Sequence, residues 1–236
     1  MGGRGTVSVT GGKINIGSLG SDGNDILGVG GNPDKREGIN TMFVSELGFS
    51  SVDGLSTMQT AVLGSYGIAL NNLERKYGAI ASMDVDIPVL GMNTVSTIAA
   101  VRFGNDGKPN GLLISRNKMG KTSTLTGIQR KSEASGFSMP TDGKLTSVAR
   151  YAITHEYGHL IHSALSMKAN KPKYKIAMEV KSLAEKKYGA SDKSLSSYGH
   201  RNYDEFFAEA FANANSGNPN AIGKAMNDYL QQNSLR

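Results

Sequence analysis

The sequence predicts an α+β fold, and three observations lead to this prediction. Short segments of β character lie near the middle of the chain, a strongly apolar helical segment follows them, and most of the remainder is helical. With 236 residues, 38% of them hydrophobic, the chain is long enough for one sizeable domain or two small ones. We expect an arm at residues 1–40 and a domain at 41–236, with a helix-and-sheet lobe at 41–143 and a helical lobe at 144–236.

The first 40 residues are rich in Gly, Ser, Asn and Asp and hold few large apolar side chains, so we expect a flexible or irregular arm. Residues 1–6 fit the N-myristoylation pattern, but a Gly-rich segment matches that pattern easily. Residues 20–27 resemble one calcium-binding β-roll repeat. Because a single repeat cannot stack into a roll, we interpret it as a turn-rich loop.

The first lobe is predicted to contain a long helix and a hairpin. Residues 56–76 have apolar side chains at helical spacing, and Gly78 follows their basic end, where a helix stop is expected. The β-rich segments 94–103 and 111–116 are joined by a run of turn-forming residues, which predicts a hairpin. The polar segment 118–143 is interpreted as a loop, and either a substrate-facing loop or an inert connector fits its composition.

The second lobe opens on a helix that is apolar on two sides, which is typical of a buried helix. One stripe comprises Val148, Ala152, His155, His159 and His162, and the other comprises Ile153, Tyr157, Leu160 and Ala164. A helix is predicted from Pro172 to about Tyr188, followed by a loop at 190–202. The next helix begins after Asn202, and a last helix ends near Leu235. The predicted core stripe of the helix after Asn202 is Tyr203, Phe207, Ala210, Phe211 and Ala214.

The composition excludes several kinds of chemistry. The chain has no cysteine, so disulfides, iron–sulfur clusters, thiolate zinc sites and a cysteine nucleophile are excluded. No apolar run is long enough to cross a bilayer, so we expect no membrane partner. The N-terminus lacks a secretory apolar region. We therefore expect a protein that is cytoplasmic, virion-associated or delivered by a non-classical route. The net charge is +6, but the lysines at 168–175 and 181–187 are best explained as a solvated helix surface, so no nucleic-acid partner is expected. The oligomeric state stays open.

The central motif is His155-Glu156-Tyr157-Gly158-His159, an intact H-E-x-x-H. On a helix, residues four apart share a face about 5–6 Å apart, so His155 and His159 can hold one metal ion with Glu156 beside it. Zinc binds neutral imidazole well, and a catalytic zinc site keeps one position for water. We therefore expect a Zn²⁺ site. The alternative is a pair of histidines that face a polar groove.

A third ligand has to come from elsewhere in the chain. The metzincin pattern would need Gly and His where this chain has His162 and Leu165, so that arrangement is excluded and His162 is interpreted as a packing residue or a contact of the ligands. The remaining candidates are His200, Glu205 and Glu209. We choose Glu205 as the ligand and expect Glu209 and His200 to contact the ligands from behind. A solvated acidic helix face is the alternative for the two glutamates.

A second segment lies downstream of the H-E-x-x-H motif, at residues 198–211. It reads Tyr-Gly-His-Arg-Asn-Tyr-Asp-Glu-Phe-Phe-Ala-Glu-Ala-Phe. Together the two segments resemble the catalytic domain of anthrax lethal factor and the Pro-Pro endopeptidases, and similar segments occur in phage and mobile-element zincins. The resemblance covers about residues 150–212. It implies that Glu205 is the third zinc ligand, that Tyr198 faces the metal and steadies the oxyanion, and that Glu209 is the acid behind the ligands.

The resemblance also implies a zincin-like, gluzincin-type catalytic domain over residues 41–236, with a small mixed sheet whose edge strand lies over the active-site helix. The expected function is a zinc metalloendopeptidase in which Glu156 is the general base and a peptide binds as an extended strand at the sheet edge. Two alternatives stay open. One is a non-cutting virion or mobile-element protein on the same scaffold, and the other is a delivered toxin or effector protease domain.

Overall fold

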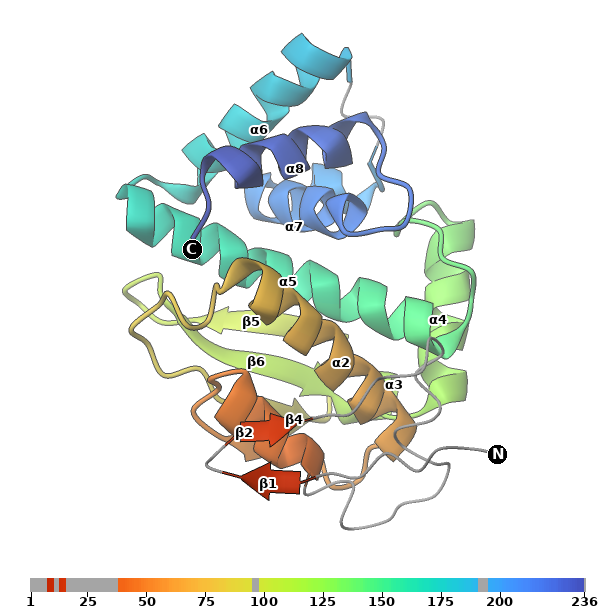
Figure 1. The fold of residues 1–236 in the computed structure, drawn as a ribbon. Helices are drawn as coiled ribbons and strands as arrows, with labels where there is room; N and C mark the ends of the chain where they lie inside the picture. Colours follow the sequence, from red (N-terminus) through yellow and green to blue (C-terminus); the bar gives the residue numbers. More distant parts are fainter. Residues whose placement is uncertain (1–7, 11–12, 16–37, 95–97, 191–194, 236) are drawn as a thin grey trace.

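The computed structural model describes residues 8–10, 13–15, 38–94, 98–190 and 195–235. This part of the chain combines helices with a small mixed sheet, so the predicted α+β class is confirmed. The long helix α5 (Leu145–Ala169) crosses the middle of the molecule, with the sheet on one side and the C-terminal helices on the other (Figure 1). Every residue of α5 from Ile153 to Leu165 is buried, because other helices and the sheet pack on both sides of α5.

Four strands of the described chain form the sheet in the order β3-β4-β6-β5. β3 (Val52–Asp53) runs parallel to β4 (Val89–Met92), and β4 runs parallel to β6 (Pro109–Ser115). β5 (Ala99–Phe103) runs antiparallel to β6, with Val101 opposite Leu112, and lies at the sheet edge. The predicted hairpin is thereby confirmed, whereas β3 and β4 are too short to have given a sequence signal.

The predicted helix at 56–76 is present as α2 (Thr60–Tyr77), which begins four residues later than expected. The preceding residue Gln59 has extended backbone, which sets the start of the helix. Gly78 ends α2 with a φ of 68°, a left-handed conformation that favours glycine. The π-helical turn η1 (Met42–Glu46) packs on α2, and α3 (Arg116–Met119) directly follows β6.

The prediction of a loop over residues 118–143 is wrong for its first half, because α4 (Thr122–Ala134) is helical. Only Leu125 and Gln129 of this helix are buried, so its apolar pattern is too sparse to indicate a helix. Gln59 holds its first turn, since the Gln59 side-chain oxygen accepts a hydrogen bond from the first backbone N–H of α4 at 2.9 Å. A contact between segments 63 residues apart cannot be read from local sequence.

The remaining helices agree with the predictions. They are α6 (Lys173–Tyr188), α7 (Tyr203–Ala214) and α8 (Ala221–Gln232). Gly189 ends α6 with a φ of 61°. α8 ends somewhat before the expected position near Leu235. α6 and α7 pack on the side of α5 that faces away from the sheet, and α8 packs on α6 and α7 (Figure 1).

Two local predictions in this lobe need correction. The prediction that Tyr203 belongs to the core is wrong, because this side chain is 47% exposed. Tyr203 is the first residue of α7 and precedes the part of the helix that packs against its neighbours. Phe206 is buried instead. The predicted loop at 190–202 contains a short 3-10 turn, η3 (Tyr198–His200), within its described part.

Within residues 1–40, for which an arm is predicted, β1 (Ser8–Thr10) and β2 (Lys13–Asn15) pair antiparallel. The myristoylation pattern at 1–6 and the repeat-like segment at 20–27 lie outside the described residues.

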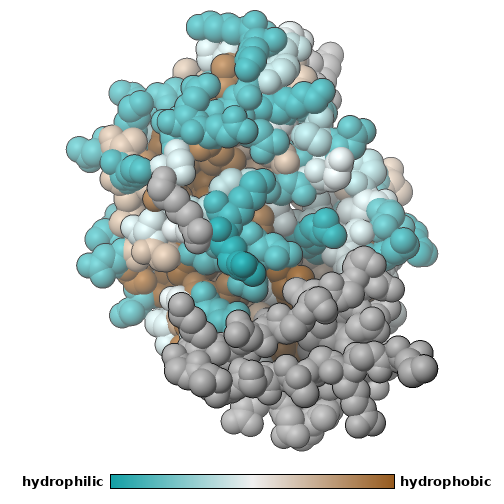
Figure 2. Space-filling view, viewed as in Figure 1, coloured by the Kyte–Doolittle hydropathy of each residue, from teal (hydrophilic) through white to brown (hydrophobic). Residues whose placement is uncertain are grey.

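The space-filling view shows hydrophilic side chains over the upper part of the molecule, where α6 and α8 lie in the ribbon (Figure 2). Lys187 of α6 contacts Asp228 of α8 at 2.7 Å, and its side chain remains 54% exposed. This agrees with a solvated helix surface for the lysines of this region. Among the described residues, none of the helices combines the length and the apolar character needed to span a bilayer.

Candidate metal centre

Three side chains from two helices converge at the middle of the molecule. His155 and His159 lie one turn apart on α5, and Glu205 reaches them from the first turn of α7. Glu205 Oε2 lies 3.1 Å from His155 Nε2 and 3.5 Å from His159 Nε2. The ligand atoms of all three residues lie within 4.8 Å of one another. The structure therefore brings together the three residues that the sequence analysis selected as metal ligands.

A close approach between α5 and α7 makes this convergence possible. A Cβ atom on Gly158 would lie 2.8 Å from the Cα atom of Ala208, so only glycine fits between the two helices. At the start of α7, the side chain of Asn202 accepts a hydrogen bond from Glu205 N at 2.9 Å. This helix cap fixes the first turn of α7, which carries Glu205.

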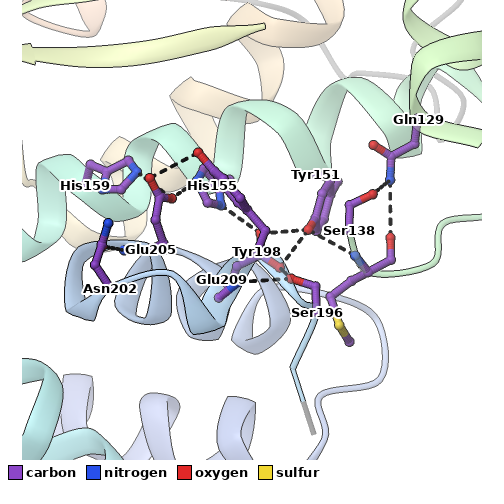
Figure 3. A network of polar contacts seen from close by, with 12 residues as sticks. Gln129, Ser138, Tyr151, His155, His159, Ser196, Tyr198, Asn202, Glu205 and Glu209 are labelled. Carbon is purple, nitrogen blue, oxygen red and sulfur yellow. Dashed lines mark hydrogen bonds and ion pairs between the residues drawn. The ribbon is translucent and has the colours of Figure 1, made fainter. Parts of the chain in front are cut away.

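Glu209 contacts His155 through Nδ1, the ring nitrogen that faces away from Glu205. Its Oε1 lies 2.8 Å from His155 Nδ1, and its two oxygens lie 2.8 and 2.9 Å from the Tyr151 hydroxyl, which donates to the carboxylate. The Ser196 hydroxyl also donates to Glu209 (Figure 3). Because a carboxylate can only accept, Nδ1 of His155 carries a proton and Nε2 is the nitrogen that faces Glu205. This is the orientation that a metal-binding histidine needs.

Either a proton or a metal ion can lie between His155 Nε2 and Glu205. A proton there makes His155 a cation, and His159 Nε2 then makes a second, longer contact of 3.5 Å with the same carboxylate oxygen. One metal ion could instead be shared by all three donors, whose ligand atoms lie within 4.8 Å of one another. Tetrahedral zinc with bonds of about 2.0–2.2 Å separates its ligand atoms by about 3.3 Å. The separations of 3.1 and 3.5 Å fit that value. The donor set of two imidazoles and one carboxylate therefore fits zinc.

The electrostatics of the three donors show how strongly they interact. Burial disfavours a charged His155, but hydrogen bonds with Glu205 and Glu209 outweigh burial and raise the pKa of His155 to about 10. Burial also acts to raise the pKa of Glu205, yet the hydrogen bonds with His155 and His159 bring it well below its usual range. The site thus favours an ionised Glu205, the form that binds a cation.

Glu156 lies beside the cluster with one oxygen unpaired. Its residue exposure is 7%, and within the described chain its buried Oε2 has no hydrogen-bond partner. Burial raises the pKa of this carboxyl, and the neighbouring His155 and His159 oppose the shift. A buried oxygen without a partner is costly, so it indicates a position where a solvent molecule or a ligand completes the site.

A cleft of about 240 Å³ opens beside His155 and Glu156. The sheet edge, α4 and the segment after α4 form its apolar wall, which comprises Ile98, Ala99, Leu125, Ile128 and Phe137. The polar residues of the lining include Gln129, Tyr151 and Tyr198. The segment interpreted as a loop at 118–143 thus lines the cleft next to the cluster, and its contact with a substrate stays a prediction.

Tyr198 is positioned by contacts on both of its sides. Its ring lies 4.8 Å from the ring of Phe137 and 5.4 Å from that of His155, measured between centroids. Its hydroxyl donates to Glu205 Oε1 at 3.0 Å. Burial and the negative charge of Glu205 raise the pKa of Tyr198 above its ordinary value, so the hydroxyl keeps its proton at neutral pH.

Two other predicted candidates lie outside the cluster. His200 is exposed and lines a separate hollow with Lys181 and Phe206, so its expected contact with the ligands is wrong. His162 is buried against the ring of Phe207, with stacked rings 4.1 Å apart, and its Nε2 lies 2.8 Å from the carbonyl oxygen of Lys173. Its position is that of a packing residue, one of the two interpretations given above.

Tyr151, Ser196 and Phe137 are further residues of the site that no sequence motif indicated. Tyr151 lies four residues before His155, so helical spacing alone would have placed it on the same face. Ser196 and Phe137 lie in irregular segments that are brought together by tertiary contacts, and no local pattern indicates their position. The backbone N–H of Ser197 donates to the Gly136 carbonyl at 2.9 Å, which holds these two segments side by side.

The fold and the site define an α+β domain with a two-histidine, one-carboxylate cluster at the edge of a cleft. No family model matches this chain, and no curated protein or solved structure matches it either.

Proposed function

We propose that this protein is a zinc metalloendopeptidase whose metal is held by His155, His159 and Glu205. The observation that carries the proposal is the convergence of their three donor atoms beside Glu156, a buried carboxylate with an unpaired oxygen. A structural zinc site is closed by four protein ligands, whereas a catalytic one has three and an open position. The described part of the chain offers three.

Bound zinc would polarise the scissile carbonyl and lower the pKa of a water molecule to about 7. Glu156 is suited to accept the proton of the attacking water, because the residue lines the same cleft as His155 and one of its carboxylate oxygens has no hydrogen-bond partner among the described residues. The same carboxyl then donates that proton to the leaving amine, so Glu156 ends the cycle in its starting state. His155 stays oriented throughout by its contact with Glu209.

Tyr198 is proposed to stabilise the oxyanion of the tetrahedral intermediate. Its hydroxyl is protonated at neutral pH and lies next to Glu205, at the rim of the cleft. A donor placed where negative charge develops contributes mainly in the transition state. A small movement from Glu205 toward the substrate would allow this contact.

The peptide is proposed to bind as an extended strand along β5. This strand pairs with β6 on one side only in the described sheet, and Ala99 at its start lines the cleft. An unpaired strand edge presents N–H and C=O groups that a peptide backbone can use. A zincin-like arrangement of edge strand over active-site helix, as the resemblance implies, belongs to this proposal.

The test uses a peptide library derived from a proteome, with sequencing of the products. The protein loaded with zinc should generate new termini, and Glu156→Gln should bind zinc equally while forming at least about 100-fold fewer products. The amide keeps the shape of the side chain but cannot take up the proton. A protein that binds zinc and cleaves no peptide would support a non-cutting scaffold instead, and cleavage by Glu156→Gln at the parental rate would exclude the proposed base.

A further inference from the structure

Tyr151 connects two parts of the molecule through its hydroxyl group. The hydroxyl accepts a hydrogen bond from the backbone N–H of Met139 at 3.1 Å and donates to Glu209. Glu209 in turn contacts Nδ1 of His155 at 2.8 Å. A continuous chain of hydrogen bonds therefore runs from the segment after α4, through Tyr151 and Glu209, to a metal ligand (Figure 3).

The far end of this chain is fixed to α4. Nε2 of Gln129 donates to the Met139 carbonyl and to the Ser138 hydroxyl, both at 3.2 Å. Gln129, Ser138 and Tyr151 all line the cleft that also contains His155. A molecule that fills the cleft therefore lies against both ends of the hydrogen-bond chain.

We propose that Tyr151 is a positioning residue that holds Glu209 against His155 and couples the segment at residues 137–139 to the metal centre. Phe137 and Ser138 of this segment line the cleft. The inference rests on the metal centre proposed above. It assigns a role to Tyr151, which belongs neither to the H-E-x-x-H motif nor to the acidic pair on α7. A histidine ligand binds metal best when its ring is held in one orientation. Glu209 can hold the ring only if its own carboxylate is fixed, and Tyr151 supplies one of its two hydroxyl donors among the described residues.

The coupling works in both directions. If Tyr151 links the segment at 137–139 to His155, zinc binding should order that segment, and ordering of that segment should strengthen zinc binding by the same factor. The backbone N–H of Met139 reports on the link directly, because its hydrogen-bond acceptor is the Tyr151 hydroxyl itself.

The first measurement compares zinc affinity in Tyr151→Phe and Tyr157→Phe by competition with a chromophoric chelator. Tyr157 is a matched control on the same helix: it is buried, and its hydroxyl accepts from Ala79 N at 3.1 Å and donates to Glu74 at 2.5 Å, away from the cluster. We expect Tyr151→Phe to weaken zinc binding about 10-fold to 100-fold and to change the absorption spectrum of the cobalt-substituted protein. Tyr157→Phe should lower thermal stability but leave both metal readouts unchanged.

The second measurement is hydrogen exchange at the Met139 amide with and without zinc. Zinc should slow this exchange in the parent protein and in Ser196→Ala, which loses the other hydroxyl donor to Glu209 but keeps the Met139 contact. Zinc should have no effect on it in Tyr151→Phe.

The possible outcomes separate the inference from the metal centre. Failure of the parent protein to bind zinc would overturn both. Zinc bound by the parent and equally well by Tyr151→Phe would overturn the positioning role alone. An equal loss of zinc affinity in Tyr157→Phe would also overturn it, because the effect would then come from the stability of α5.

Discussion

Gly158 on α5 faces Ala208 on α7 with no room for a side chain, since a Cβ atom at Gly158 would lie 2.8 Å from Ala208 Cα and 3.2 Å from its carbonyl oxygen. The atoms it would meet include backbone atoms, which cannot rotate away. This contact sets the distance between the helix that carries the two histidines and the helix that carries Glu205.

Gly158→Ala should therefore separate α5 from α7. We expect a loss of about 1–3 kcal/mol in the free energy of unfolding, as for other overpacked sites, together with weaker zinc binding. Chemical denaturation and a zinc titration measure the two effects. Gly127→Ala on α4 is the control, because a Cβ atom there meets nothing within 4 Å and alanine favours the helix. Unchanged stability in Gly158→Ala would show that the helices can adjust.

Glu205→Ala should lose most of its zinc affinity, because two histidines remain where three ligands converged. His200→Ala should bind zinc like the parent protein, since His200 is exposed and lines a separate hollow. Competition with a chromophoric chelator compares the two variants. The opposite result, with zinc lost in His200→Ala and kept in Glu205→Ala, would mean that the ligand set has been assigned wrongly.

Tyr198→Phe should keep zinc, fold and an approximately unchanged KM while kcat falls about 100-fold to 1000-fold, as expected for loss of one oxyanion donor. The ring contacts with Phe137 and His155 remain in this variant, so packing is preserved. Tyr203→Phe, at a 47% exposed tyrosine, serves as the control. A kcat equal to that of the parent would limit Tyr198 to packing.

The sequence predicted those parts of the fold that have a strong local pattern. The buried helix α5 follows from its two apolar stripes, and the placement of Glu205 and Glu209 follows from their spacing after the cap residue Asn202. The convergence of Glu205 with the histidines depends on Gly158, whose role is visible only when α7 is packed against it. Helix α4 was missed because a distant side chain, Gln59, holds its first turn. Long-range contacts of this kind leave no periodic signal.

The central claim is that His155, His159 and Glu205 form a zinc site, and the most direct measurement is the zinc content of the purified protein by elemental analysis. The account predicts about one zinc per chain, removed by a strong chelator and restored by added zinc, because three converging ligands leave one open position. Zinc well below one per chain that does not rise on adding zinc would contradict it.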